Sequence, residues 1–140
     1  MNYFIRGFMQ PNELKQFIQA AFNNVLENLP LADSVCDKYF SKNYIQYVDG
    51  KKLNYDDFIL HLKMLQLKMK SIKITFKHII VEDDKVATLH IVDGIKNDGE
   101  EVKVQVNALM QVQEGKIILC DELTHLIQGQ ASDKDLGSAN

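Results

Sequence analysis

The fold is decided by residues Ile72–Leu123, which read IKITFKHIIVEDDKVATLHIVDGIKNDGEEVKVQVNALMQVQEGKIILCDEL. Apolar residues alternate with polar ones along much of this stretch, a pattern typical of strands with one buried face. Three short polar pairs interrupt the alternation, at Asp83-Asp84, Asp98-Gly99 and Glu114-Gly115. Each pair suits a two-residue hairpin turn, so the stretch predicts four consecutive antiparallel strands.

Two-residue turns also predict which residues lie side by side in this sheet. One face then consists mainly of apolar residues: Ile72, Ile74, Phe76, His78, Ile80, Ala87, Leu89, Ile91, Asp93, Val104, Val106, Ala108, Met110, Val112, Ile117, Leu119, Asp121 and Leu123. The polar residues that interrupt it are His78, Asp93 and Asp121. Because an unpaired buried carboxylate is costly, these intrusions predict a partly polar cavity on the inner face of the sheet.

The first half of the chain is predicted to be largely helical. Residues 12–29 place apolar side chains at helical spacing, and a short helix is expected over residues 33–40. An extended segment at 43–48 precedes a third helix over 54–69, for which Asn54 is the expected cap. The apolar stripes of these helices need a partner. The chain therefore predicts an α+β cone, with three N-terminal helices packed in the concave face of a strongly curved antiparallel sheet.

Composition and charge exclude several classes of partner. The chain has 140 residues, 46% hydrophobic and 25% charged, and a formal net charge of −3. We expect a single domain over residues 1–129 and a disordered tail over residues 130–140. Net negative charge argues against nucleic acid or an anionic membrane as a partner. No apolar run approaches the ~20 residues that span a bilayer, and Met1–Met9 make a poor signal peptide, so a cytoplasmic protein is expected.

Short motifs resemble those of a known family. The run NYIQYVDG at Asn43–Gly50, the later Phe58, and EGKI at Glu114–Ile117 look like SnoaL-like members of the nuclear transport factor 2-like superfamily. Related proteins often have a histidine where this chain has Tyr47. The resemblance covers residues 12–129 and implies the cone fold with a small-molecule pocket. The superfamily holds both enzymes and binding modules on one fold, so it implies no single activity.

Candidates for acid/base chemistry are Asp121, His78 and Tyr47. The resemblance implies that an aspartate of the late strands acts as the acid/base group of polyketide cyclases, and Asp121 is the match. The expected register places Asp121 opposite the small Ala108, which leaves room for a ligand atom. A carboxyl group in an apolar cavity is held toward its neutral form and can then shuttle a proton. A tyrosine hydroxyl or His78 would polarise a ligand oxygen.

Other residues around this face are expected to contact the ligand: Tyr44, His61, Asp93, Ala108 and Leu119. Structural alternatives stay open for several candidates. Asp121 could be neutralised by a nearby tyrosine or histidine, and His78 could be a satisfied core histidine. A bulge at Gly94 could rotate Asp93 outward.

Two functions fit these residues. One is a cofactor-free isomerase or cyclase acting on a small apolar carbonyl compound, and the other is a non-catalytic dimeric ligand-binding or accessory module. The second sheet face is expected to support a homodimer, because it mixes polar and apolar residues: Asn107, Leu109, Cys120, Glu122 and Thr124. No metal site is expected, since the four histidines lack metal-binding spacing, and no cofactor motif is present.

Overall fold

The computed structural model describes residues 9–28 and 33–136. Its helices are α1 (Pro11–Phe22), α2 (Asp33–Tyr39) and α3 (Tyr55–Lys68), with a π-helical turn η2 (Asn23–Glu27) and a 3₁₀ helix η3 (Ala131–Asp135). Its strands are β1 (Phe40–Val48), β2 (Lys51–Asn54), β3 (Met69–Glu82), β4 (Lys85–Lys96), β5 (Glu101–Gln113) and β6 (Lys116–Gln128). They form one sheet in the order β2-β1-β6-β5-β4-β3. The predicted α+β fold is confirmed, but the sheet is mixed, because β1 runs parallel to β6.

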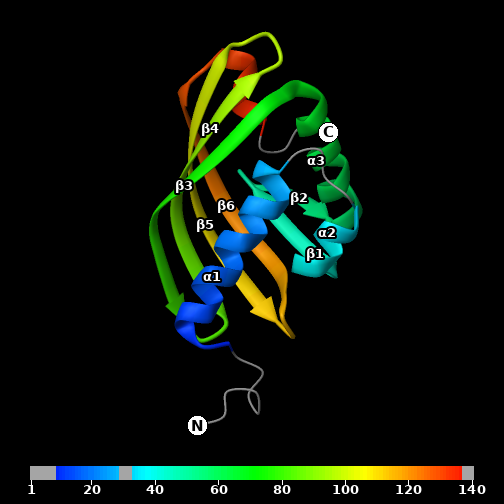
Figure 1. Cartoon of the computed structure of the whole chain (residues 1–140), viewed down its shortest axis with the longest axis vertical. Coiled ribbons are helices and arrows are strands. Elements are labelled where there is room, and N and C mark those ends of the chain that lie inside the picture. Colours follow the sequence, from blue (N-terminus) through cyan, green and yellow to red (C-terminus); the bar gives the residue numbers. More distant parts are fainter. Residues whose placement is uncertain (1–8, 29–32, 137–140) are drawn as a thin grey trace.

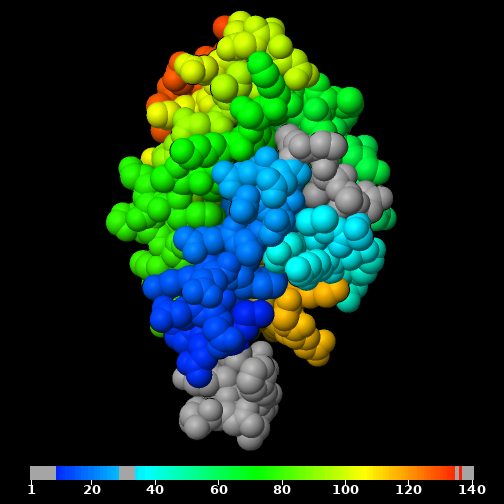
Figure 2. Space-filling view, in the orientation of Figure 1, coloured from blue at the N-terminus to red at the C-terminus, as the bar shows by residue number. Residues whose placement is uncertain are grey.

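Helix α1 lies across the concave side of the sheet, with β3 to β6 on one side and β1, β2, α2 and α3 on the other (Figure 1). In the same view, α1 covers the middle of the molecule (Figure 2). The helix starts at Pro11, and its buried side chains include Ile18 and Phe22. The Phe22 ring meets Phe76 of β3 edge-on at 5.2 Å between centroids. This apolar stripe is what holds α1 against the sheet.

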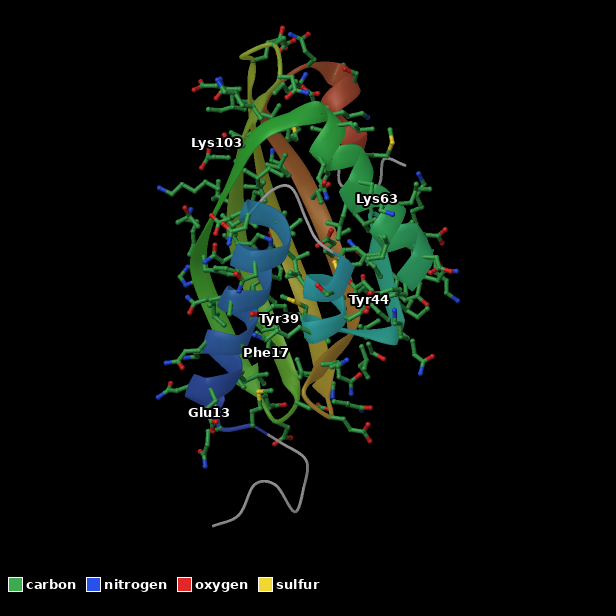
Figure 3. All side chains as sticks on the ribbon, turned by 45° about the vertical axis from the view of Figure 1, so that its right-hand side comes forward. Glu13, Phe17, Tyr39, Tyr44, Lys63 and Lys103 are labelled. Carbon is green, nitrogen blue, oxygen red and sulfur yellow. The ribbon has the colours of Figure 1, made fainter. Side chains whose placement is uncertain are left out.

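Helix α2 is attached to α1 through aromatic rings. Figure 3 shows Phe17 of α1 beside Tyr39 of α2, whose ring centroids are 5.5 Å apart. Helix α3 begins as predicted at Asn54, whose Oδ1 accepts a hydrogen bond from the backbone N of Asp57 at 2.9 Å. Strand β2 immediately before it was not predicted. None of the helices in the described ranges is long and apolar enough to cross a membrane.

The three hairpin turns differ in length. Asp83-Asp84 and Glu114-Gly115 are two-residue turns as predicted, and Glu114 and Gly115 have the positive φ values, 52° and 76°, that a type I′ turn requires. A two-residue turn at Asp98-Gly99 is wrong. The backbone N of Lys96 donates to the O of Glu100 at 2.9 Å, which leaves three residues in the loop. Gly99, with φ of 90°, supplies the left-handed residue that such a loop needs.

Among the β-bulges of the described sheet, two change the faces of the predicted site residues. In β3, the pairing with β4 slips by one residue between Phe76 and His78, so Lys77 is the extra residue. In β6, the pairing with β5 slips between Ile117 and Leu119, so Ile118 is extra. Side chains alternate between the faces of a strand, so each slip moves every residue beyond it to the opposite face.

The three-residue loop between β4 and β5 and these two bulges decide which polar residues face inward. Thr88 and His90 of β4, and Cys120, Glu122 and Thr124 of β6, lie on the inner face. The outer, dimer-forming positions predicted for Cys120, Glu122 and Thr124 are therefore wrong. Predicted inner positions that are wrong, because these residues lie on the outer face, are those of His78, Ile80, Ala87, Leu89, Ile91, Asp93, Leu119, Asp121 and Leu123. The inner positions predicted for β5, from Val104 to Val112, are confirmed.

The chain after β6 closes one end of the cone. Where the sequence predicts disorder from Gln130 onward, the structure has the 3₁₀ helix η3. Asp133 in this helix is buried, and its Oδ1 lies 2.8 Å from the Nζ of Lys96 on β4. Its Oδ2 accepts a hydrogen bond from the backbone N of Gln130 at 2.7 Å. Residues 137–140 lie outside the described residues.

Candidate functional site

A cavity of about 140 Å³ lies between α1, η2, α3 and the inner face of the sheet. Its walls are mostly apolar and include the rings of Phe22, Phe40 and Phe58. A few polar side chains interrupt them: Tyr44 and Gln46 from β1, His61 from α3, His90 from β4, and Cys120, Glu122 and Thr124 from β6. An apolar cavity with a few convergent polar groups is the usual form of a small-molecule site.

Glu122 ends a chain of hydrogen bonds that starts at Tyr44, which is labelled in Figure 3. The hydroxyl of Tyr44 donates to Oε1 of Gln46 at 3.2 Å, and Nε2 of Gln46 donates to Oε1 of Glu122 at 3.1 Å. The thiol of Cys120 approaches Oε2 of Glu122 at 3.6 Å. Strands β1 and β6 run side by side here, so their alternating inward residues meet. The orientation of the Glu122 carboxyl is therefore held from two strands.

The surroundings of Glu122 favour its neutral form. Burial raises the pKa of the Glu122 carboxyl to about 7. The hydrogen bonds from Cys120 and Gln46 lower this pKa, while the nearby charges of Asp49 and Asp121 raise it. A carboxyl group with a pKa near 7 is present in both protonation states at neutral pH. It can thus act as a general base or as a general acid.

Two other groups of this hydrogen-bonded network, Tyr44 and Cys120, stay protonated. Burial raises the pKa of the Tyr44 hydroxyl well above its usual value, and the same cause raises the pKa of the Cys120 thiol. Both groups therefore serve as hydrogen-bond donors at neutral pH, and Cys120 is not poised as a thiolate nucleophile.

A second polar group of the cavity is His90 on β4. Its Nδ1 lies 2.9 Å from the hydroxyl oxygen of Thr88. Its ring meets Phe22 edge-on at 5.1 Å and Phe76 at 5.2 Å between centroids. Burial lowers the pKa of His90 to about 4, so the imidazole is neutral at physiological pH.

The residues predicted for acid/base chemistry lie away from this cavity. Asp121 is exposed on the outer face, paired with Leu109 of β5, and the small Ala108 instead faces Glu122. His78 is exposed on the outer face of β3, and Tyr47 is 36% exposed. The bulges at Lys77 and Ile118 are the physical reason for the changed faces of β3 and β6.

The predicted ligand contacts divide into three groups. Tyr44 and His61 line the cavity, whereas Leu119 and Asp93 are on the outer face, where Asp93 lies 3.6 Å from the Nζ of Lys103. Ala108 is buried on the inner face beside Glu122, but it is not part of the cavity wall.

Sequence reasoning missed Gln46, His90 and Glu122. One signal was available for Glu122, because two adjacent acids on a strand must point to opposite faces, and Asp121-Glu122 is such a pair. Residues that could hold a metal are not gathered here. Within residues 9–28 and 33–136, no three His, Cys, Asp or Glu side chains lie close enough together to bind a metal ion.

Comparison with solved structures shows the same fold in proteins of low sequence identity. A protein from Jannaschia sp., described as a candidate SnoaL-like polyketide cyclase, matches with a TM-score of 0.70 at 13% identity, over 83% of this chain and 89% of that one. An LEH-like epoxide hydrolase from M. tuberculosis matches with a TM-score of 0.68 at 17% identity, over 81% and 84%. An NTF2-like protein of unknown function from Exiguobacterium sp. matches with a TM-score of 0.65 at 16% identity, over 80% and 98%.

Comparison of sequences gives one clear relative. No family model matches the chain. An uncharacterised protein of Schizosaccharomyces pombe is 37% identical over 100 residues, which is 71% of this chain and 77% of that protein. The chain therefore belongs to the same family as this S. pombe protein, and its fold is that of the SnoaL-like and NTF2-like proteins to which it is structurally similar.

Proposed function

We propose that the cavity binds a small, mostly apolar carbonyl compound and that Glu122 moves a proton on it without a cofactor. The observation that carries this proposal is a carboxyl group with a pKa of about 7 at the wall of an apolar cavity. The reaction class is an isomerisation or cyclisation through an enol. Small-molecule chemistry on this fold is supported by the neighbours described as a polyketide cyclase and an epoxide hydrolase.

The proposed reaction moves one proton, which Glu122 first takes from the ligand and then returns to it. As a carboxylate, Glu122 takes a proton from the carbon next to the ligand carbonyl, and the resulting acid returns that proton to another carbon or to oxygen. Gln46 and Cys120 hold the carboxyl group in one orientation during both steps. His61 lines the same cavity and can polarise the carbonyl oxygen.

Exchange of solvent deuterium into an enolisable ketone tests this function. We expect the protein to accelerate exchange at the carbons next to the carbonyl of cyclohexanone, measured by NMR. Glu122→Gln should abolish the acceleration, and Asp121→Asn is the matched control, because its carboxyl lies on the opposite face of the same strand. Equal loss of activity in both variants, or retention in Glu122→Gln, would contradict the role of Glu122.

A non-catalytic binding module is the second candidate, and one observation favours it. Both oxygens of the Glu122 carboxyl already have protein partners, Gln46 and Cys120. A carboxyl group that is satisfied by the protein can serve mainly to orient a bound molecule. Binding of cyclohexanone without accelerated exchange, together with a small molecule retained in native mass spectrometry, would favour this module over the enzyme.

We also propose that the protein is a homodimer through the outer sheet face. Leu109 and Leu123 are 43% and 66% exposed there, and half-buried Leu89 and Ile91 lie on the same face. Such an apolar area is typical of a protein interface. Light scattering should give a dimer mass, and Leu123→Asp should reduce it to a monomer. Leu67→Asp on α3, at a residue 70% exposed, is the control. A monomer mass for the unmodified protein at micromolar concentration would contradict the dimer.

A cytoplasmic location is the last part of the proposal. Cys36 and Cys120 are both buried thiols, which suits a reducing compartment. Fluorescence microscopy of a tagged chain tests the location, and exclusive signal in a secretory or membrane compartment would contradict it.

A further inference from the structure

One nitrogen of His90 is available to a ligand. His90 is 2% exposed and lines the cavity, and its Nδ1 is paired with the hydroxyl of Thr88. Among the described residues, no fully enclosed side-chain nitrogen or oxygen lacks a hydrogen-bond partner. Since Nε2 of His90 has no protein partner in that part of the chain, it must border open space, and the space that His90 borders is the cavity.

The Thr88 hydroxyl allows Nε2 of His90 to be either a hydrogen-bond donor or an acceptor. A hydroxyl can donate a hydrogen bond to Nδ1 or accept one from it. In the first case Nε2 carries the proton and donates to a ligand, and in the second it accepts. His90 can therefore bind either a carbonyl or a hydroxyl oxygen.

His90 and Glu122 line the cavity from different strands. His90 pairs with Val106 of β5, and Glu122 pairs with Ala108 of the same strand. The two residues are thus two strands apart and displaced by two residues, or about 12 Å between Cα atoms on a flat sheet. Both side chains line the cavity, whose walls are mainly apolar.

The size and polarity of the cavity limit which ligands fit between His90 and Glu122. Its volume of about 140 Å³ is close to that of engineered apolar cavities of roughly 150 Å³ that bind benzene. A charged ligand would lose its hydration in a mostly apolar space where burial holds both His90 and Glu122 toward neutrality. An uncharged molecule with about one six-membered ring fits these limits.

We propose that the ligand is an uncharged monocyclic compound with two oxygen functions, one the carbonyl beside which Glu122 moves a proton and the other bound by Nε2 of His90. This inference rests on the proposed function and names its substrate class: cyclic hydroxy ketones, diketones or equivalent phenols. His90 is a specificity-determining residue in this scheme, because it selects for the second oxygen.

A matched series of probes tests the substrate class. Cyclohexane, cyclohexanone and 4-hydroxycyclohexanone differ only in having no, one or two oxygen functions. Kd is measured by NMR titration at pH 6.5. We expect each added oxygen to tighten binding about fivefold, the effect of one hydrogen bond. The ¹⁵N signal of His90 Nε2 should move with 4-hydroxycyclohexanone and stay in place with cyclohexane. Equal Kd values for cyclohexanone and 4-hydroxycyclohexanone, with no movement of this signal, would overturn the inference.

A variant isolates the contribution of His90. His90→Phe keeps a ring between Phe22 and Phe76 but removes both nitrogens. It should bind 4-hydroxycyclohexanone no better than cyclohexanone, with the Kd of cyclohexanone unchanged. His125→Phe, at an exposed position on the outer face of β6, is the control and should change no Kd.

The outcomes separate this inference from the proposed function. If cyclohexanone binds and moves the signals of Glu122 but the second oxygen adds no affinity, the inference fails alone. If none of the probes moves the signals of residues that line the cavity, both the inference and the proposed function fail. The ¹⁵N signal of the unmodified protein decides the question if His90→Phe does not fold.

Discussion

The inner and outer faces of the sheet carry similar side chains in different surroundings. Asp121 and Glu122 are neighbours on β6, but Asp121 is exposed to solvent, whereas Glu122 faces an apolar cavity and contacts Gln46 and Cys120. His78 and His90 differ in the same way. On the inner face, burial lowers the pKa of His90 to about 4 and raises the pKa of Glu122 to about 7. The difference shows that the chemistry available to these side chains depends on which face they occupy.

The largest effect is expected from removing the contact between α1 and the inner face. Phe22 is buried against Phe76 and His90, so Phe22→Ala should cost about 3–5 kcal/mol of unfolding free energy. Urea denaturation measures this loss. Phe17→Ala, on the same helix but half-buried against Tyr39, should cost clearly less. A loss below about 1 kcal/mol for Phe22→Ala would mean that α1 does not pack in the concave face.

The pH dependence of stability distinguishes Glu122 from Asp121. Since the pKa of Glu122 is raised to about 7 in the folded state, the folded protein holds a proton that the unfolded chain releases above about pH 4.5. This group's contribution to stability is present at low pH and is lost as pH rises through 7, by up to about 3 kcal/mol. The difference in stability between Glu122→Gln and the unmodified protein should therefore grow over this range in favour of the variant. Urea melts at pH 4.5, 6 and 8 measure it. Asp121→Asn is the control, and a Glu122→Gln curve parallel to that of the unmodified protein would refute the buried acid.

For His90, the change of stability with pH has the opposite sign. Its pKa falls from 6.5 to about 4 in the folded state, so the unfolded chain binds a proton more readily between these values. The contribution of neutral His90 is present above pH 6.5 and is lost as pH falls toward 4, by up to about 3 kcal/mol. His90→Phe should remove this loss. Between pH 4.5 and 6.5, rising pH lowers the stability of the unmodified protein through Glu122 and raises it through His90. Each variant removes one of these effects and should therefore show the pH dependence of the other. The absence of any change in slope for His90→Phe would refute burial of a neutral imidazole.

A smaller effect is expected where η3 closes the cone. Burial alone would raise the pKa of Asp133, but its hydrogen bonds with Lys96 and with the backbone of Gln130 lower it. Asp133→Asn can keep the bond to Gln130 but loses the charge opposite Lys96, so we expect a cost of about 1 kcal/mol. Hydrogen exchange of η3 should accelerate more than that of β5. Asp98→Asn in the exposed β4–β5 loop is the control, and unchanged exchange in Asp133→Asn would show that the ion pair does not hold η3.

Much of the fold could be predicted from local patterns, because a few adjacent residues determine a helix period or a two-residue turn. Asn54 and the pair Glu114-Gly115 are examples. The loop at Asp98-Gly99 and the bulges at Lys77 and Ile118 could not, since the same residues fit either register and tertiary packing selects one.

The candidate site was predicted in part for the same reason. Tyr44 and His61 lie on elements whose faces are set by local pattern, and both line the cavity. His90 lies beyond the three-residue loop and Glu122 beyond the Ile118 bulge, counted from the neighbouring strand β5. An error of one residue in either count places the wrong side chain in the cavity.

The Ile118 bulge also bears on how this fold can diverge. Loss of the bulge with every residue kept would pair Ile118 with Gln111, and Asp121 would then take the place of Glu122 opposite Ala108. Leu119 and Leu123 would turn inward with it, and both are apolar. In either register, with or without the bulge, β6 turns one acidic side chain inward between neighbours that can be buried. Loss of this bulge alone would thus replace the acid beside the cavity by one that is a methylene shorter, a change of specificity that needs no new acidic residue.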